Sequence, residues 1–280
     1  MSDLGEIRTK IDALDTELLR LLNERAELAR EIGVIKSRES LPIYSPDRET
    51  KLLRSLVERS QGPLRPEAIR AIYREIMSAS LALEKDVAIA CLGPSGSPTH
   101  QAALGKFGSS VRYTFASEIA GVFEEVSEDR ADCGVVPLEI PTQGHVSHTL
   151  DELAESDVSV CAEIKIDVNS EDEVARYLVL GRTPNAPSGQ DHTMLMLRIE
   201  DKPGALVSAL EPFKELEINL SHFASRPAMR GSDDIFFFVE ADGHTRELEI
   251  VDLFRELSKK CRAVKVLGSY PRDITGEASA

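Results

Sequence analysis

Charged side chains interrupt an apolar helical pattern near the start of this 280-residue sequence. Arg25 is the one polar member of a ten-residue series spaced alternately by three and four positions. The other nine members are Leu4, Ile7, Ile11, Leu14, Leu18, Leu21, Leu28, Ile32 and Ile35. This spacing predicts a single stripe of a long α-helix, buried against other helices. A cation in such a stripe is costly unless an anion meets it, so Arg25 indicates a binding role.

Further polar residues continue this pattern within the first 84 residues. Lys36 lies beyond small residues on the same helix, and Ser80 and Glu84 continue an apolar face at helical spacing. Arg48 and Glu49 fall in the first turn of a second helix, whose free backbone amides favour an anion. Taken singly, Lys36 could extend to water and Arg48 and Glu49 could form a solvated pair. Together these residues predict a pocket for a small organic dianion or trianion.

Three helices must position these side chains. The predicted helices span residues 4–37, 46–60 and 66–84, and are separated by proline-containing and glycine-containing breaks. At about 1.5 Å per residue, the first helix would be about 50 Å long. It is too long to bury its stripe against its own short neighbours. The segment therefore predicts an intertwined helical homodimer.

The chain changes character after residue 86. Short apolar runs separated by helical stretches predict an α/β domain, followed by a turn-rich linker at 182–189. The predicted strands of this domain are 87–92, 111–114, 133–137, 158–166 and 175–180. Residues 191–272 then read strand, helix, strand, strand, helix, strand, which is the ferredoxin-like βαββαβ order. We therefore expect a multidomain α plus α/β protein with domains at 1–85, 86–181 and 190–273.

Composition limits the classes of partner. The net charge of -15 argues against nucleic acid, because phosphate binding needs a basic face. No stretch approaches the roughly 18 apolar residues of a membrane span, and the first residues show no signal-peptide core. These features predict a cytoplasmic protein that does not bind membranes. The four cysteines show no paired metal spacing, so we expect no metal site.

The first 84 residues resemble the all-helical chorismate mutases in the order, spacing and type of their residues. The matching segments are 7–12, 23–25, 32–36, 42–44, 47–49 and 78–80. The resemblance implies an intertwined dimer in which Arg8 enters the partner's site. It also implies conversion of chorismate to prephenate, a unimolecular rearrangement that needs no cofactor. Arg8 and Arg25 would then grip the two substrate carboxylates.

The same resemblance implies roles for the other candidates. Lys36 would face the ether oxygen that gains negative charge as its bond to carbon breaks, and Glu84 would donate a second hydrogen bond to that oxygen. Arg48 and Glu49 would hold the substrate hydroxyl and its neighbours, and Ser80 would support a carboxylate. Many relatives have glutamine where this chain has Glu84, which can donate only when protonated.

The middle domain resembles prephenate dehydratases, but in about half their length. The family's second lobe is expected to be missing, because the chain passes from 161–164 almost directly to 179–181. Within residues 139–142, Ile140 and Pro141 replace the amide and the first hydroxyl of the family's Glu-Asn-Ser-Thr stretch, and Ala175 replaces the threonine of its Thr-Arg-Phe motif. An alanine can neither donate a proton nor orient a group that does. We therefore expect no dehydratase activity.

The C-terminal domain resembles the ACT domains that bind amino acids. The resemblance implies phenylalanine as an effector, held by residues from two stretches, and leaves open a dimerising module without a ligand. The residues implied in binding are Gly204, Ala205, Leu206, Asn219, Ser225 and Arg226. Ala224 replaces the family's usual glutamate, which weakens the case for an intact site.

Three functions therefore remain in view. The first is a chorismate mutase of aromatic amino acid biosynthesis, with a degenerate dehydratase domain and regulation by phenylalanine. The second is a bifunctional chorismate mutase/prephenate dehydratase. The third is a non-enzymatic sensor of aromatic amino acids.

Overall fold

The computed structural model describes residues 3–39, 41–141, 144–168, 173–227 and 234–272. Its N-terminal segment holds three helices, α1 (Leu4–Glu39), α2 (Pro46–Arg59) and α3 (Pro66–Glu84). Their bounds lie within a few residues of those predicted. Proline in the first turn of α2 and α3 explains where both begin, because its fixed φ suits a helix start.

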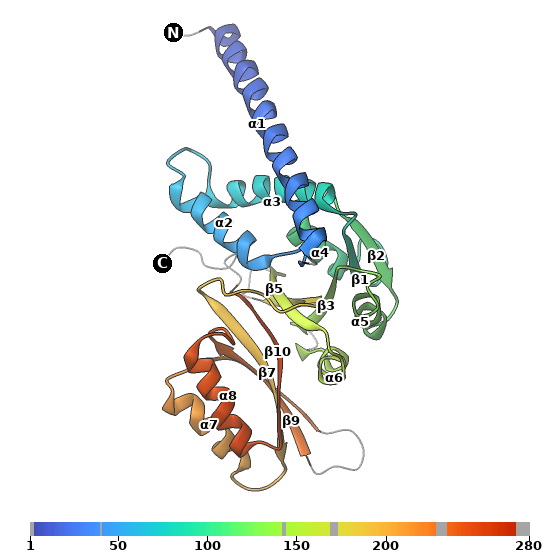
Figure 1. Ribbon diagram of the computed structural model, residues 1–280, viewed down its shortest axis with the longest axis vertical. Coiled ribbons are helices and arrows are strands. Elements are labelled where there is room, and N and C mark those ends of the chain that lie inside the picture. The colour runs from blue at the N-terminus through green and yellow to red at the C-terminus, as the bar shows by residue number, and fades with distance from the viewer. Residues whose placement is uncertain (1–2, 40, 142–143, 169–172, 228–233, 273–280) are drawn as a thin grey trace.

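Helix α1 projects well beyond α2 and α3 (Figure 1). Each of the nine apolar residues in its stripe is at least 38% exposed, and the buried residues of α1 are Ala29 and Gly33. The stripe is thus exposed within a single chain, as expected for a helix too long to bury it against its own neighbours, and its burial against a partner chain stays a prediction. The reason for the exposure is geometric, since α3 covers α1 only near its C-terminal end.

The middle domain is built on a mixed sheet with the strand order β2-β1-β3-β6-β5. Strands β1 and β2, and β1 and β3, pair in parallel, whereas β6 is antiparallel to both β3 and β5. The strands are β1 (Ala88–Leu92), β2 (Arg112–Ala116), β3 (Cys133–Ile140), β4 (Gly144–His145), β5 (Ser159–Asp167) and β6 (Val174–Gly181). The helices are α4 (Pro98–Phe107), α5 (Ile119–Ser127) and α6 (Ser147–Glu155). The five predicted strands are present, and the two-residue β4 was missed.

Strands β5 and β6 form a hairpin joined by residues 168–173 alone. The amide of Val168 donates to the carbonyl of Glu173 at 2.8 Å, next to the paired ends of the two strands. This short connection leaves no room for a second lobe at this point in the chain.

The C-terminal domain has an antiparallel sheet with the order β10-β7-β9-β8. Its strands are β7 (Asp191–Glu200), β8 (Leu220–Pro227), β9 (Asp234–Asp242) and β10 (Ala263–Pro271). Helices α7 (Ala205–Glu215) and α8 (Leu248–Lys260) pack on one face of the sheet (Figure 1). The βαββαβ order of elements agrees with the sequence prediction.

The other face of this sheet packs on the middle domain. Met194, Phe238 and Tyr270 belong to the same buried apolar cluster as Leu138 and Leu180 of the middle domain. Strand β10 approaches β5 so closely that a Cβ at Gly268 would lie 2.1 Å from the carbonyl oxygen of Val160. The two domains therefore share one core, which fixes their relative placement. No described helix is long and apolar enough to cross a membrane.

Candidate functional site

Lys36 and Glu84 meet where α1 crosses α3. The Lys36 ammonium donates to Glu84 Oε2 at 2.8 Å and to the carbonyl of Ile43 at 2.7 Å. The side chains of Lys36 and Glu84 are 17% and 9% exposed. The ion pair is therefore largely shielded from solvent. Electrostatic interactions are stronger in such a shielded place than in water.

Arg25 approaches α3 one turn before Glu84. Its guanidinium donates to the hydroxyl of Ser80, which in turn donates to the carbonyl of Ile76 at 2.8 Å. Because Ser80 and Glu84 are four residues apart, they share one face of α3. Two cations of α1 are thus aimed at one face of α3.

The close crossing depends on a glycine in α1. A Cβ placed on Gly33 would lie 2.7 Å from the Cα of Glu84 and 2.8 Å from its carbonyl oxygen. Real Cβ atoms do not approach backbone this closely, so any larger residue must push the helices apart. The absent side chain at position 33 therefore sets how near Lys36 comes to Glu84.

Replacing Gly33 with alanine is expected to destabilise the helical segment by about 1–3 kcal/mol, the usual cost of overpacking. Chemical denaturation followed by circular dichroism measures the change. Gly105→Ala is the matched control, because nothing lies within 4 Å of a Cβ built there in α4. Alanine favours a helix, so the control should be neutral or stabilising. Equal stability of the two variants would contradict the close-packing argument.

Three predicted site residues are not gathered with these four in a single chain. Arg8 is exposed on α1, about 25 Å along the helix from Arg25 at 1.5 Å per residue. Arg48 is exposed on α2. Glu49 forms an ion pair with Lys106 of α4 at 3.3 Å. Sequence reasoning missed Lys106, which no spacing relates to the helical segment.

The C-terminal candidates are partly dispersed. Gly204 has a φ of +82° and precedes α7, a conformation that favours glycine. Ala205 and Leu206 lie in the first turn of α7 and pack against the apolar core of the C-terminal domain. Asn219 and Ser225 are exposed.

Arg226, the last C-terminal candidate, binds the middle domain in this structure. Its guanidinium holds the carboxylate of Asp151 at 2.7 to 3.1 Å and donates to the hydroxyl of Ser147 at 3.0 Å. Both partners lie in α6. Arg226 was expected to face a ligand, whereas in the folded chain it pairs with side chains across a domain boundary.

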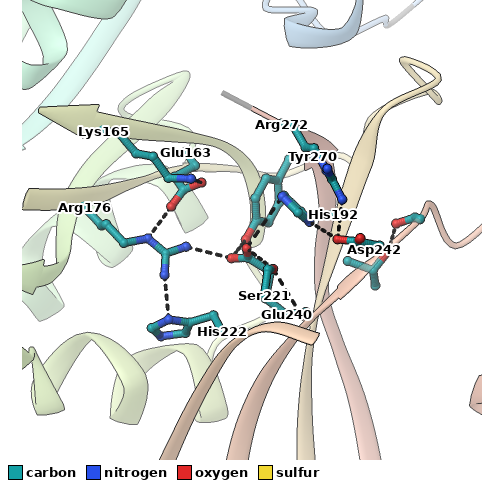
Figure 2. A network of polar contacts seen from close by, with 12 residues as sticks. Glu163, Lys165, Arg176, His192, Ser221, His222, Glu240, Asp242, Tyr270 and Arg272 are labelled. Carbon is teal, nitrogen blue, oxygen red and sulfur yellow. Dashed lines mark hydrogen bonds and ion pairs between the residues drawn. The ribbon is translucent and has the colours of Figure 1, made fainter. Parts of the chain in front are cut away.

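A buried polar network surrounds Arg176, the residue after Ala175, at the boundary between the middle and C-terminal domains (Figure 2). The Arg176 guanidinium donates to Glu163, to Glu240 Oε2 at 2.9 Å and to His222 Nδ1 at 2.6 Å. The phenol of Tyr270 also donates to Glu240, at 2.7 Å. Two carboxylates from different domains therefore share one arginine.

Charges in this network shift the pKa values of its members. Burial and then the Arg176 charge lower the pKa of His222 to about 4. Burial would raise the pKa of Glu240, but the Arg176 charge and its other partners outweigh it and lower that pKa to about 2. At neutral pH His222 is therefore neutral and Glu240 ionised.

Acid should accordingly destabilise the chain. A histidine in the unfolded chain has a pKa near 6.5. As pH falls from about 6.5 to about 4, His222 is therefore protonated in the unfolded state but not in the folded state, which lowers the free energy of unfolding. Glu240 adds the same trend from about pH 4.5 to about 2, where the folded carboxylate resists protonation. Denaturant unfolding between pH 7 and 4.5 measures the loss. His222→Gln should flatten the profile, whereas exposed His148→Gln should not; parallel profiles for wild type and His222→Gln would refute this assignment.

One cluster has the spacing of metal ligands. Glu139, His145 and His222 each offer a ligand atom, and these atoms lie within 4.8 Å of one another. The Arg176 guanidinium lies 2.6 Å from His222 Nδ1 and 3.9 Å from Glu139. That fixed positive charge disfavours a metal cation at this cluster.

Comparisons with known proteins identify two segments of the chain. The family model for chorismate mutase type II matches residues 7–85, and that for prephenate dehydratase matches residues 89–182. The bifunctional chorismate mutase/prephenate dehydratase of Aquifex aeolicus is 36% identical over 362 aligned positions, covering 99% of this chain and 100% of the relative. Because this chain has 280 residues, at least 82 of those positions hold no residue of it.

Solved structures of prephenate dehydratases resemble about two thirds of the chain. Prephenate dehydratase from Streptococcus mutans has a TM-score of 0.58 and 29% identity, covering 66% of this chain and 97% of that one. Prephenate dehydratase from Arthrobacter aurescens in complex with L-Phe has a TM-score of 0.61 and 20% identity, covering 66% and 90%. The second likeness shows the fold alone.

These comparisons bear on the expected loss of dehydratase activity. The dehydratase family model matches the middle domain, and the relative is named as bifunctional, so the comparisons do not support that expectation. Ala175 lies in β6, and Thr142 lies outside the described residues. By its relation to the Aquifex protein over its whole length, the chain belongs to the bifunctional chorismate mutase/prephenate dehydratase family.

Proposed function

We propose that the chain is a chorismate mutase that converts chorismate to prephenate. The observation that carries this proposal is the pairing of Arg25 with Ser80 and of Lys36 with Glu84 across one helix crossing. Membership of the family supports the same activity. A unimolecular rearrangement asks the protein only to hold the reactive conformer and stabilise developing charge, which fixed cations can do.

The residues divide this work between substrate binding and charge stabilisation. Arg25, supported by Ser80, binds one carboxylate of chorismate. Lys36 turns from Glu84 towards the ether oxygen as that oxygen gains negative charge, and Glu84 can donate a second hydrogen bond to it when it carries a proton. Arg48 and Glu49 close over the substrate hydroxyl from α2.

The second carboxylate would be bound by Arg8 of a partner chain. Arg8 lies about 25 Å from Arg25 along its own helix, so it cannot reach the same substrate within one chain. The exposed apolar stripe of α1 supports pairing with another copy, because burying it would remove much apolar surface from water. We therefore propose an intertwined homodimer with mixed sites.

The role of Glu84 as a hydrogen-bond donor can be tested by replacement with glutamine. A carboxylate cannot donate a hydrogen bond, whereas an amide of the same length always can. Glu84→Gln should therefore keep or raise kcat/KM for chorismate. The measurement is steady-state kinetics of both proteins under the same conditions. Loss of activity in a folded variant would refute this role.

A single assay separates the candidate functions. Purified protein is given chorismate and the products are identified by chromatography. Prephenate that accumulates supports the mutase alone. Phenylpyruvate supports the bifunctional enzyme, which the match to the dehydratase family favours as the second candidate. Unchanged chorismate would overturn the proposal and favour the non-enzymatic sensor.

We further propose that the C-terminal domain is an ACT domain responsive to phenylalanine. Its βαββαβ topology and the left-handed Gly204 before α7 support this assignment. Because Arg226 is held by Asp151, a ligand that needs Arg226 would have to break an interdomain ion pair. The mutase assay with and without phenylalanine tests the effect. No change in activity would leave the domain as a dimerising module.

A further inference from the structure

A cavity of about 310 Å³ lies where the three domains meet. Helices α2 and α3 form part of its wall, α4 and β5 form another part, and Pro271 and Arg272 contribute from the end of β10. This three-domain cavity lies outside the Lys36–Glu84 crossing. Its volume is at the lower end for small-molecule sites, which suits a single ring with its substituents.

The lining of the three-domain cavity is cationic in an acidic protein. It contains five basic side chains and three acidic ones, although the whole chain carries a net charge of -15. The basic residues are Arg70, Arg74, Lys106, Lys165 and Arg272. Most of the remaining lining is apolar, as at Leu53 and Ile164. Basic side chains beside apolar ones fit a carboxylate on an apolar body.

Arg70 gives the most specific indication of a missing anion. Its side chain is 24% exposed, and its Nε is buried without a hydrogen-bond partner among the described residues. The carboxylate paired with it, Glu67, lies 4.0 Å from Nη1 and has a side chain that is 76% exposed. A buried guanidinium nitrogen without a partner is costly, and a carboxylate can satisfy two of its N–H groups at once.

Lys106 links this cavity to the proposed mutase site. Its ammonium pairs with Glu49 at 3.3 Å, and the two side chains are 21% and 14% exposed. Glu49 is the residue of α2 that we assign to the chorismate hydroxyl. While it is paired with Lys106, its carboxylate is held in the cavity wall. An anion that competes for Lys106 would release it.

We propose that the three-domain cavity binds a small aromatic carboxylate without an ammonium group, and that the bound carboxylate frees Glu49 from Lys106 and so activates the mutase. The binding half of this inference stands on the cavity alone. The activation half rests on the proposed function. An aromatic 2-oxo acid fits the lining better than an amino acid, because an ammonium group would face an excess of positive charge.

Isothermal titration calorimetry on the full-length chain tests the binding, with phenylpyruvate as the probe. Arg70→Met should weaken binding at least tenfold. Arg65→Met, an exposed arginine at the start of the same helix, is the matched control and should leave it unchanged. Phenylalanine should bind at least tenfold more weakly than phenylpyruvate. Absence of saturable binding at millimolar phenylpyruvate, or equal binding by wild type and Arg70→Met, would overturn the site.

Mutase kinetics test the link to Glu49. Phenylpyruvate should raise kcat/KM of the wild type about threefold or more. Lys106→Met should show the raised value without the ligand and no further response, whereas Arg70→Met should keep the basal value and lose the response. If Lys106→Met keeps the basal value and still responds, the link is overturned. A chain that binds phenylpyruvate through Arg70 but has no mutase activity would overturn the proposed function and the activation, and leave the binding site standing.

Discussion

Replacing Lys36 with methionine should lower kcat/KM for chorismate by about 10²- to 10³-fold, the usual effect of removing one preorganised donor from a site of developing charge. Methionine keeps the unbranched stem and removes the ammonium. The loss should fall mainly on kcat, because the ether oxygen gains its charge only in the transition state.

The effect on Lys36 is measured by following chorismate disappearance in steady-state kinetics. Lys259→Met is the control, since Lys259 is 61% exposed and pairs with Glu256 on α8. The free energy of unfolding is a second measurement. It should fall in Lys36→Met, because the variant leaves Glu84 without its ion-pair partner. If Lys36→Met folds and retains full kcat, the site proposed between α1 and α3 is wrong.

Replacing Arg176 with methionine should reduce the free energy of unfolding by about 3–5 kcal/mol, the usual range when one partner of a buried ion pair is removed. The Arg176 side chain is 11% exposed, and those of Glu163 and Glu240 are 0% and 2% exposed. Without the guanidinium, two buried carboxylates would lose the cation that they share (Figure 2). The middle and C-terminal domains should therefore loosen together.

Chemical denaturation measures the cost of losing Arg176. Arg255→Met is the control, because Arg255 is 64% exposed and should change stability by less than about 1 kcal/mol. Adding Glu163→Gln and Glu240→Gln to Arg176→Met should recover part of the loss, since it removes the unpaired charges. If the triple variant is no more stable than Arg176→Met alone, the unpaired charges are not the cause.

The local elements were predictable because their signals are local. The three-and-four spacing gave α1, proline placed the starts of α2 and α3, and short apolar runs gave the strands of both sheets. Strand β4 was missed because two residues carry no periodicity. Gly33 and Lys36 could be related to α3 only through their residue types and the family resemblance.

The contacts between domains could not be predicted in the same way. Lys106 pairs with Glu49, and Arg226 with Asp151, across boundaries that no spacing rule connects. Arg176 joins carboxylates 13 and 64 residues away, at separations that no helical or strand periodicity relates. Such pairs depend on how the folded domains pack against each other. The residue type at one position does not reveal which residue of another domain will lie beside it.

The apolar cluster common to the middle and C-terminal domains ties these two domains into one evolutionary unit. The helical segment is the other unit, so the chain has two units rather than three. Recombination that exchanged the C-terminal domain for a foreign one would leave Leu138 and Leu180 facing an unmatched surface. The helical mutase segment has no member in that cluster and meets the middle domain at a separate one, where Ile43, Tyr44 and Leu81 pack, so its loss would expose a different apolar surface.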